Sequence, residues 1–530
     1  MAEPGTARSS VITLINSSVG AGVLSFPYAF RAFGWAAGLA AVVLIGSVES
    51  FTLYVLSRYA EYTKAGTYSG LVRKMLGPQL ALLMCAVMIA YPFGSCVAYL
   101  IITGDSFQPL LLELFGAAWY TSRTAIITAI GCGAMLPLCF RTRLGALKAV
   151  SSMCVWGLLV VVGIIVFRSA QIVRSPDYSS EAVKAVNTSS GLHFLSALVI
   201  VLFGFQCHTN VVPVFEELDP QPAFFPPSPS PSTLGGLADT AAAALSSDAA
   251  PDYSAAASEE GANGTANGMA AGNGAAAAAA AGELHYTPLP LSSGASQRSL
   301  KSEKLEGMRR VVVLAVAVTG VLYSCVGLAG YLAFPTSARS DIMLSFGEDD
   351  LLIQIARATV GLIQIAAYVI NAFPARGAIR DLILQTTGRT VGGPGFVAVQ
   401  TLAFFFSTLA LALLVTDLGN IFKVVGGTCG NVLILFMPGC LLVQYARSKH
   451  VESRKRRQLL AEAAQLEAPL LNGGAGGAAG ASGEAAEPAL PPLYSLWWSK
   501  LFWSGVVLLL LSAGLAVLTV YTTLYPLPEA

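Results

Sequence analysis

The chain consists of long apolar runs separated by shorter polar connections. A run of about 20 predominantly apolar residues is long enough to cross the hydrocarbon core of a bilayer as a helix. By this measure the sequence predicts eleven spans, at residues 11–30, 36–57, 80–104, 124–140, 148–168, 191–214, 311–334, 351–373, 395–416, 420–444 and 500–522. The apolar residues fill these runs instead of recurring at amphipathic spacing, which indicates an all-α polytopic membrane protein.

Two polar segments interrupt the spans. Residues 220–305 are rich in Ala, Gly, Ser and Pro and too poor in large apolar residues to fold, so we expect a disordered cytoplasmic loop. Residues 446–497 begin basic and become low in complexity, which predicts a second cytoplasmic loop. The other parts are then a cytoplasmic N-terminal tail at 1–10, spans one to six at 11–219, spans seven to ten at 306–445, and the last span with a short tail at 498–530.

The start of the second loop is basic and helix-prone. The simplest interpretation is a solvated linker whose Lys and Arg residues touch anionic lipid of the bilayer. A sorting or partner-binding helix is the alternative, and trafficking machinery would then be a partner of the cytoplasmic loops.

Charge predicts the orientation and excludes one class of partner. The net charge is +1, only 12% of residues are charged, and these lie almost wholly between the apolar runs, so no nucleic acid is expected as a partner. Lys and Arg gather in the connections that are cytoplasmic if the N-terminus is cytoplasmic, which places the C-terminus on the non-cytoplasmic side. The sequon at Asn187 then lies in a non-cytoplasmic loop, where an oligosaccharide could be attached.

Two spans contain residues that interrupt helices. The first reads LINSSVGAGVLSFP at residues 14–27, and the sixth reads VLFGFQCHTNVVPVFEEL at residues 201–218. Gly- or Pro-interrupted segments at matching places in two halves indicate an inverted-repeat transporter, in which the freed backbone groups bind the solute. Helix N-termini would attract its carboxylate, and unwound carbonyls would accept its ammonium group or a cation. The alternative is that the small residues merely allow close helix contact.

The residues around these breaks resemble a known family. Residues 16–35 look like the first-span signature of the amino acid/auxin permease (AAAP) family, and residues 203–218 look like the sixth span of its sodium-coupled neutral amino acid transporter branch. The matching positions are Asn16, Gly20, Gly22, Leu24, Pro27, Tyr28, Ala29 and Gly34 in the first span, Phe203, Phe205, Cys207, His208, Val211, Pro213, Glu217 and Leu218 in the sixth, and Gly426, Gly427, Thr428, Phe436 and Pro438 in the tenth.

The resemblance implies a LeuT-like fold, a 5+5 inverted repeat plus an eleventh transmembrane helix, and symport of a neutral amino acid with a cation by alternating access. It implies no cofactor and no metal centre beyond a coupling ion, H⁺ or Na⁺. Relatives with these signatures occur in plasma, vacuolar and lysosomal membranes, so the membrane stays open. Carried onto this sequence, the substrate and cation site comprises Asn16, Ser17, Gly20, Ala21, Gly22, Gly204, Gln206 and His208.

One departure from the family pattern bears on the coupling ion. The sodium-coupled branch has hydroxyl residues in span eight, where this chain places Ala367 at the position of an expected threonine. A methyl group cannot coordinate sodium, which favours a proton. A titratable group at membrane depth would then carry the proton; the candidates are Glu49, His208 and Asp417. Glu49 could instead hydrogen-bond another helix in its neutral form, and His208 could be a neutral imidazole between helices.

Two further basic residues are expected at the membrane surface. Arg357 and Lys423, near the starts of spans eight and ten, are expected to extend to the interface.

A transporter-like receptor that binds an amino acid and signals with little flux is the alternative to a carrier. An enzyme is not expected, since the spans hold no HExxH pair, no two-metal carboxylate cluster and no Ser-His-Asp set.

Overall fold

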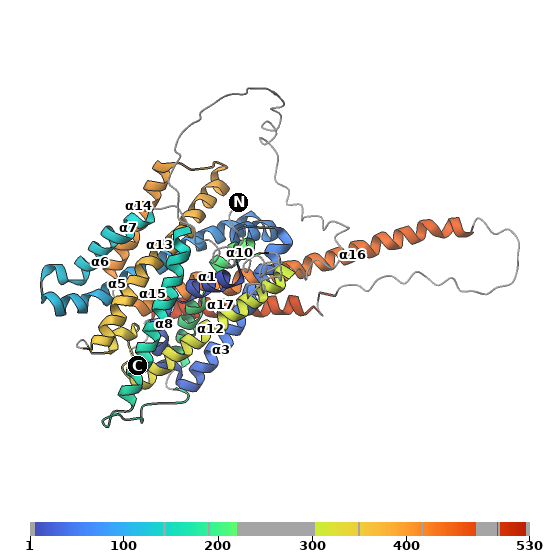
Figure 1. The fold of residues 1–530 in the computed structure, drawn as a ribbon. Helices are drawn as coiled ribbons and strands as arrows, with labels where there is room; N and C mark the ends of the chain where they lie inside the picture. The colour runs from blue at the N-terminus through green and yellow to red at the C-terminus, as the bar shows by residue number, and fades with distance from the viewer. Residues whose placement is uncertain are drawn as a thin grey trace, which may run out of the picture. The chain divides into compact units, whose positions relative to one another are not determined.

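The computed structural model describes residues 6–140, 145–188, 191–219, 303–347, 350–415, 417–472, 495–496 and 499–525. The regular secondary structure of these residues is helical (Figure 1). Most of the expected loop at 220–305, and the low-complexity part of 446–497, lie outside the described residues. The predictions made for those segments therefore stay predictions.

The helices run in the order α1 (Ala7–Ser18), η1 (Ala21–Ser25), α2 (Phe26–Phe33), α3 (Trp35–Thr63), α4 (Tyr68–Leu76), α5 (Pro78–Phe115), η2 (Trp119–Thr121), α6 (Arg123–Ile130), η3 (Gly131–Met135), α7 (Leu136–Cys139), α8 (Gly145–Val173), α9 (Gly191–Phe205), α10 (His208–Glu217), α12 (Glu303–Ala333), η4 (Ile342–Ser345), α13 (Leu351–Thr387), α14 (Pro394–Leu414), α15 (Leu418–Val425), η5 (Gly426–Gly430), η6 (Val432–Phe436), α16 (Met437–Asn472) and α17 (Lys500–Leu524).

Each of the eleven predicted spans corresponds to helices of the described part. Nine helical stretches are long and apolar enough to cross a membrane, the first span is a helix pair bent by 50°, and the fourth is the shorter apolar helix Arg123–Cys139. The predicted all-α polytopic fold is confirmed. The interrupted spans are the first and the sixth, the two on which the LeuT-like interpretation depends.

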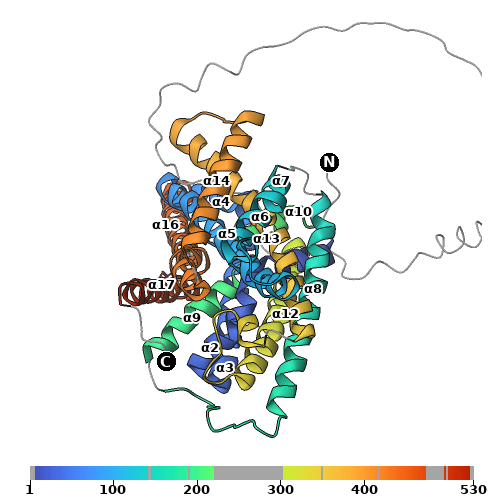
Figure 2. The same ribbon diagram turned by 90° about the vertical axis from the view of Figure 1, so that its left-hand side faces the viewer.

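Small residues let the spans approach closely around the interrupted helices. α12 lies against α1, α2 and α3, and Figure 2 shows it near α3. A Cβ at Gly327 would lie 2.7 Å from the ring of Phe30, and one at Gly330 would lie 2.5 Å from Pro27. α13 packs along α5, where Gly361 leaves room for a phenylalanine ring. Because lipid tails are as apolar as the side chains, such close packing is what holds membrane helices together.

A buried arginine holds the connection between α12 and α13. Arg357 is 1% exposed, and its Nη2 donates to the carbonyl oxygens of Met343 at 3.0 Å and Phe346 at 3.2 Å. The expectation that Arg357 extends to the interface was wrong. The connection that contains η4 folds back over the guanidinium, and its carbonyls take the place of water.

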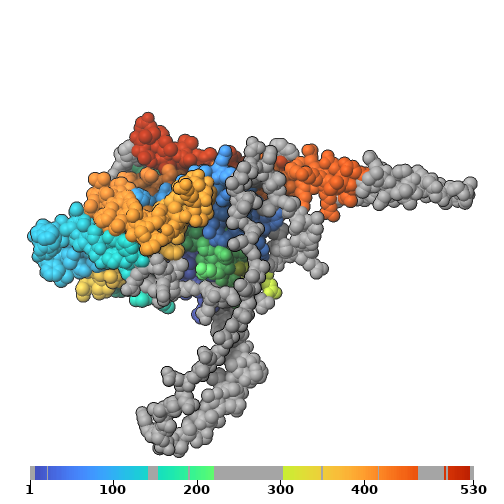
Figure 3. Space-filling model, turned by 90° about the horizontal axis from the view of Figure 1, so that it is seen from above, coloured from blue at the N-terminus to red at the C-terminus, as the bar shows by residue number. Residues whose placement is uncertain are grey.

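The last two spans pack on each other. α16 continues without a break from span ten through the basic segment to Asn472 and extends beyond the bundle (Figures 1 and 3). α17 lies along α16, where a Cβ at Gly505 would be 2.8 Å from the carbonyl oxygen of Gly439. Just before α16, Asn431 donates from its side chain to the carbonyl of Ser512 at 2.8 Å. The eleventh helix is thus fixed to the tenth.

Candidate functional site

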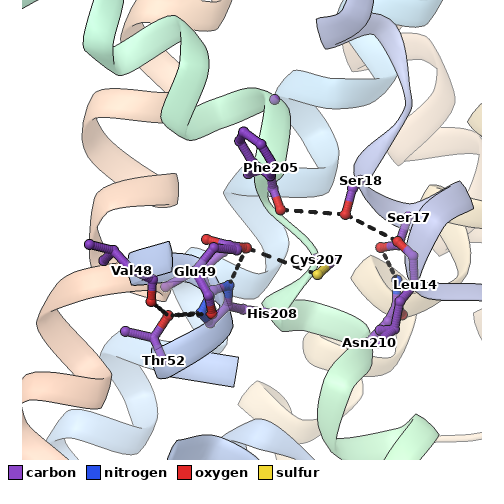
Figure 4. A network of polar contacts seen from close by, with 12 residues as sticks. Leu14, Ser17, Ser18, Val48, Glu49, Thr52, Phe205, Cys207, His208 and Asn210 are labelled. Carbon is purple, nitrogen blue, oxygen red and sulfur yellow. Dashed lines mark hydrogen bonds and ion pairs between the residues drawn. The ribbon is translucent and has the colours of Figure 1, made fainter. Parts of the chain in front are cut away.

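The two helix breaks lie side by side in the bundle (Figure 4). α1 ends at Ser18, and α9 ends at Phe205, two residues before α10 begins at His208. Ser18 Oγ is 3.1 Å from the carbonyl oxygen of Leu14 and 3.4 Å from that of Phe205. The Ser18 hydroxyl at the end of α1 is therefore within hydrogen-bond distance of a carbonyl oxygen at the end of α9.

Glycines set the distance between the breaks. A Cβ at Gly22 would lie 3.0 Å from the Cα of Gly204, and a Cβ at Gly204 would lie 2.6 Å from the ring of Phe26. The two predicted glycines thus belong to one contact. The sequence left two explanations for these glycines, close helix contact and interruption of the helices. At these two positions both apply.

A tyrosine of α12 closes this contact. The hydroxyl of Tyr323 lies 2.8 Å from the carbonyl oxygen of Ser18 and 2.6 Å from that of Gly204. Its ring stacks on Phe26 with a centroid distance of 4.0 Å. Within a bilayer an unpaired carbonyl is costly. The Ser18 carbonyl also accepts from the backbone N–H of Gly20 at 2.9 Å. Tyr323 therefore adds a second contact at the first break and supplies a donor to the Gly204 carbonyl at the second.

Asn371 of span eight is linked to the first break through the hydroxyl of Tyr99. A Cβ at Gly20 would lie 2.9 Å from the hydroxyl of Tyr99 on α5, and this hydroxyl accepts from Asn371 Nδ2 at 3.1 Å. The same amide nitrogen is 3.1 Å from the carbonyl oxygen of Ala367, one helical turn earlier. The span thus carries a polar side chain close to the position where a methyl replaces the expected hydroxyl. Ala21 follows Gly20 directly and opens η1.

A cavity of about 380 Å³, which we call the break cavity, opens beside the interrupted spans between α1, α4, α5, α10 and α13. Of the predicted site residues, Asn16 and Ser17 line it. The structure adds Thr209 and Asn210, and Asn210 Nδ2 donates to Ser17 Oγ at 2.7 Å (Figure 4). The volume falls within the range of about 300–1,000 Å³ that is common for small-molecule sites.

Gln206 lies in the second break and is buried. Its side chain is 1% exposed, and neither its amide nitrogen nor its amide oxygen has a hydrogen-bond partner among the described residues. It does not line the break cavity. An unpaired amide is costly to bury, so a solute or an ion that supplied the missing partners here would be bound favourably.

Glu49 of α3 and His208 of α10 form a buried pair. Both side chains are fully buried, and Glu49 Oε1 lies 3.1 Å from His208 Nδ1 (Figure 4). His208 Nε2 is 2.9 Å from Thr52 Oγ1, and Cys207 Sγ is 3.9 Å from Glu49 Oε1. The sequence offered Glu49 and His208 as separate proton carriers; in the structure they form one unit.

This pair is suited to holding one proton. A carboxylate beside a neutral imidazole leaves a net negative charge in an apolar interior, which is expensive, whereas one added proton makes the pair neutral overall. The titratable groups that face Glu49 from other helices are Tyr68 of α4, Tyr91 of α5 and Tyr323 of α12. In the described part, His208 is the only basic side chain within 4 Å of Glu49.

The third proton candidate, Asp417, has a structural role. It is the N-cap of α15. Its Oδ1 accepts from the backbone N–H of Gly419 at 2.9 Å and from Ser340 Oγ at 3.0 Å. Capping explains this carboxylate without any part in proton coupling.

Sequence reasoning missed several residues of the site. Tyr323, Tyr99 and Thr52 act through contacts with other helices, and nothing in their own segments distinguishes them. Asn371 and Asn210 did carry a signal, because an amide within an apolar span needs a partner. Both have one in the structure.

Known proteins align with most of the chain. The family model described as transmembrane amino acid transporter protein matches residues 3–236 and 295–462. Sodium-coupled neutral amino acid transporter 7 of Danio rerio is 25% identical over 456 residues, covering 83% of this chain and 79% of the relative. Its Homo sapiens counterpart is 26% identical over 457 residues, covering 84% and 80%. Vacuolar amino acid transporter 6 of Saccharomyces cerevisiae is 30% identical over 217 residues, covering 40% and 48%.

Among solved structures, a Na⁺-coupled sialic acid symporter in a substrate-bound outward-open state aligns over 99% of this chain and 91% of its own, with a TM-score of 0.49 and 8% identity. The family match, by contrast, spans well over half of the chain and includes both helix breaks. The resemblance to the AAAP family and to its sodium-coupled neutral amino acid transporter branch is confirmed. The chain therefore belongs to the transmembrane amino acid transporter family, whose members are membrane carriers and not enzymes.

Proposed function

We propose that this protein is a secondary active transporter that moves neutral amino acids across a membrane by alternating access around the two helix breaks. The observation that carries the proposal is the meeting of interrupted spans one and six beside the break cavity. The zebrafish and human relatives are named as neutral amino acid transporters, which supports the substrate class.

The proposed solute site lies between the breaks and the break cavity. The α-carboxylate of an amino acid suits the N–H groups where η1 and α10 begin, and the ammonium group suits the carbonyls where α1 and α9 end. Gly20, Ala21, Gly22 and Gly204 would offer backbone groups, and the uncharged polar side chains would complete the shell. These are Asn16, Ser17 and Gln206, followed by His208 at the start of α10.

The proposed coupling ion is a proton held by Glu49 and His208. The pair is neutral with one proton and negative without it, so binding and release of the proton change the charge where α3 meets the second break. Sodium is the alternative, because the zebrafish and human relatives are named as sodium-coupled. Ala367 argues against sodium, because its methyl group cannot coordinate the ion.

Uptake into proteoliposomes tests the proposal. The purified chain is reconstituted, and uptake of labelled neutral amino acids is followed under an inward proton gradient or an inward sodium gradient at matched membrane potential. We expect proton-driven uptake that Asn16→Ala abolishes. Ser9→Ala is the matched control, since Ser9 is on the same helix outside the break cavity, and it should transport normally.

The other outcomes separate the alternatives. Uptake driven by sodium alone would overturn proton coupling but keep the transporter. Saturable binding of an amino acid without gradient-driven uptake under either condition would favour the receptor that signals with little flux.

Topology and location are parts of the same proposal. We place the N-terminus in the cytoplasm and the C-terminus on the non-cytoplasmic side, in the plasma membrane or a vacuolar or lysosomal membrane. Protease accessibility of terminal tags in sealed vesicles tests the orientation, and a fluorescent fusion tests the membrane. Protection of both termini, or of neither, would contradict an odd number of spans.

A further inference from the structure

A second cavity, of about 360 Å³, lies where the ends of α2, α9, α12 and α15 meet the connection before α9. It shares no lining residue with the break cavity. None of the described residues that line it is acidic, and four are basic: Arg31, Lys184, His193 and Lys423. We call this cavity the basic pocket; under the proposed topology it faces the non-cytoplasmic side.

Backbone contacts place Lys184 at the pocket. Gly34 has φ +83°, and a Cβ there would lie 2.7 Å from the carbonyl oxygens of both Lys184 and Ala185. The backbone N–H of Trp35 donates to the Lys184 carbonyl at 3.1 Å, and the Lys184 N–H donates to the hydroxyl of Tyr331 at 2.9 Å. Only glycine allows the connection to approach α2 this closely. The position of Lys184 therefore depends on Gly34.

The sequon residue is part of the same wall. The backbone N–H of Asn187 donates to the carbonyl of Phe33 at 2.7 Å, and its side-chain Nδ2 donates to the carbonyl of Arg31 at 3.0 Å. An oligosaccharide on Nδ2 would disturb this contact. The structure thus gives Asn187 a role in shaping the pocket.

Two of the cations lie against one aromatic ring. Arg31 Cζ is 5.5 Å and Lys423 Nζ is 5.6 Å from the ring centroid of Tyr28. Lys423 thus lies in the wall of a cavity at the helix ends, and its expected place at the membrane surface stays a prediction. Among the described residues, neither Lys184 nor Lys423 has a carboxylate within 4 Å. Two lysine cations in one pocket without a carboxylate beside them repel each other, and an anion that entered would remove this cost.

A buried hydroxyl also lines the pocket. Ser196 is 5% exposed, and its Oγ has no hydrogen-bond partner among the described residues. A hydroxyl can donate to an anion. Beside it, Ala197 and Ile200 of the same helix add an apolar wall. Cations, a buried donor and an apolar wall together suit an anion with a hydrocarbon part better than a fully hydrated inorganic ion.

We propose that the basic pocket is a binding site for a small monocarboxylate. Lys184 and Lys423 pair with the carboxylate, Ser196 donates a hydrogen bond to it, and the wall around Ile200 covers a short apolar tail. The carboxylate can belong to a free amino acid or to a separate organic acid, because the recognised group is the same. A bound carboxylate would bridge α9, α15 and the connection before α9, and so stabilise this arrangement of the non-cytoplasmic ends.

Binding is tested on the purified full-length protein in lipid nanodiscs. The midpoint of thermal unfolding is recorded against increasing propionate, with its uncharged analogue propanamide, propylammonium, alanine and chloride as parallel titrations at constant pH and ionic strength. We expect a saturable rise with propionate and none with propanamide or propylammonium. Lys184→Gln and Lys423→Gln should each weaken the apparent affinity about tenfold, the loss expected for one charge-assisted hydrogen bond.

Arg339→Gln is the matched control, because Arg339 is an exposed cation in the α12–α13 connection and does not line the pocket. It should bind propionate normally. Asn16→Ala should also bind propionate, which separates this site from the transport site. The source of the carboxylate is read in Asn16→Ala, where the transport site no longer contributes. Alanine binding that depends on Lys184 and Lys423 in this variant would identify amino acids as one source; propionate binding without alanine binding would identify a separate acid. Propionate binding unchanged in both lysine variants, or chloride acting where propionate does not, would overturn the proposal.

Discussion

At the scale of single residues, one hydroxyl serves both helix breaks. Tyr323→Phe keeps the ring that stacks on Phe26 but removes the donor from the carbonyls of Ser18 and Gly204. The Ser18 carbonyl still accepts from the Gly20 N–H, whereas the Gly204 carbonyl loses its hydroxyl donor, and a buried acceptor left unsatisfied costs about 1–3 kcal/mol. We therefore expect a lower midpoint of thermal unfolding and slower amino acid uptake, measured on the purified variant and in proteoliposomes.

Tyr178→Phe is the comparison for this change. The hydroxyl of Tyr178 also donates to a carbonyl, that of Leu332 at 2.7 Å, but it serves a single acceptor in a partly exposed connection. Its loss should lower the midpoint less and leave uptake intact. Equal effects of the two variants on the unfolding midpoint and on uptake would show that the Tyr323 hydroxyl contributes no more than an ordinary hydrogen bond.

Glu49→Gln tests the buried pair directly. Glutamine keeps the shape of the side chain but cannot take up a proton, so His208 alone would face the second break. We expect proton-driven accumulation of amino acid to be lost, while exchange of internal for external amino acid persists, because the solute site itself is intact. Glu113→Gln is the control, since this exposed carboxylate at the end of α5 contacts Gln354 and not the pair. If Glu49→Gln still accumulated amino acid, either another group would carry the coupling proton or the coupling ion would be sodium.

The sequence predicted which ionisable residues lie within the membrane spans better than it predicted which residues contact one another. It singled out Glu49 and His208 because ionisable groups are rare within spans, but not that they pair, since pairing depends on how α3 and α10 pack. Arg357 was misplaced for the same reason. Its position near the end of a span predicts a place at the membrane interface, and only the folded chain shows that a connection covers its guanidinium.

At the scale of helices, the contact between the two breaks tolerates no added atoms. Gly204→Ala would place a Cβ 2.6 Å from the ring of Phe26, which is itself stacked on Tyr323 and cannot easily yield. Overpacking of this kind costs about 1–3 kcal/mol. We expect a lower unfolding midpoint and strongly reduced uptake.

Gly163→Ala is the matched change, because a Cβ at Gly163 in the long helix α8 meets nothing within 4 Å. It should be neutral, or stabilising by up to about 1 kcal/mol through helix propensity. If Gly204→Ala were as well tolerated as Gly163→Ala in both assays, the tight contact between spans one and six would not be needed for transport.

The sequence predicted where the two helices are interrupted, but not how many residues leave the helix. Clustered Gly, Ser and Pro within apolar runs located them at residues 16–22 and 204–209. In the structure the non-α-helical part of the sixth span is only residues 206–207, and Asn16 and Ser17 belong to the last turn of α1. These two residues therefore reach the break cavity with their side chains, and their backbone stays helical. Composition marks a weak point in a helix, and tertiary contacts such as that of Tyr323 decide how many residues unwind.

At the scale of the whole bundle, the two ends are held differently. Ser25 Oγ donates to the carbonyl of Ser340, and Ser340 Oγ donates to Asp417, so the connection between α12 and α13 joins the ends of α2 and α15. The break cavity lies toward the other end, where Glu217 and Asp381 line it. Under the proposed topology these serine contacts lie on the non-cytoplasmic side of the break cavity, and we expect them to separate when the carrier opens to that side.

A titratable group in the connection between α12 and α13 should make stability depend on pH. Burial, together with the nearby Asp105 carboxylate, raises the pKa of Asp341 from 3.8 to about 7. Between these values the folded chain holds a proton that the unfolded chain has released, so stability is greatest in acid and falls as pH rises toward 7. The slope is at most about 1.4 kcal/mol per pH unit. We expect Asp341→Asn to flatten the fall of the unfolding midpoint measured from pH 4.5 to 8.

Asp350 at the start of α13 provides the opposite case. Burial acts to raise its pKa, but the Arg168 side chain at 2.5 Å and the N–H groups of Leu352 and Ile353 outweigh burial and lower the pKa. Its stabilising effect is therefore lost as the medium becomes acidic, and Asp350→Asn should leave the fall toward neutral pH unchanged. A midpoint that falls equally in the parent and in Asp341→Asn would mean that another group causes the dependence. If the fall disappears only in Asp341→Asn, the Asp341 carboxyl is the group that makes the stability of the chain depend on pH.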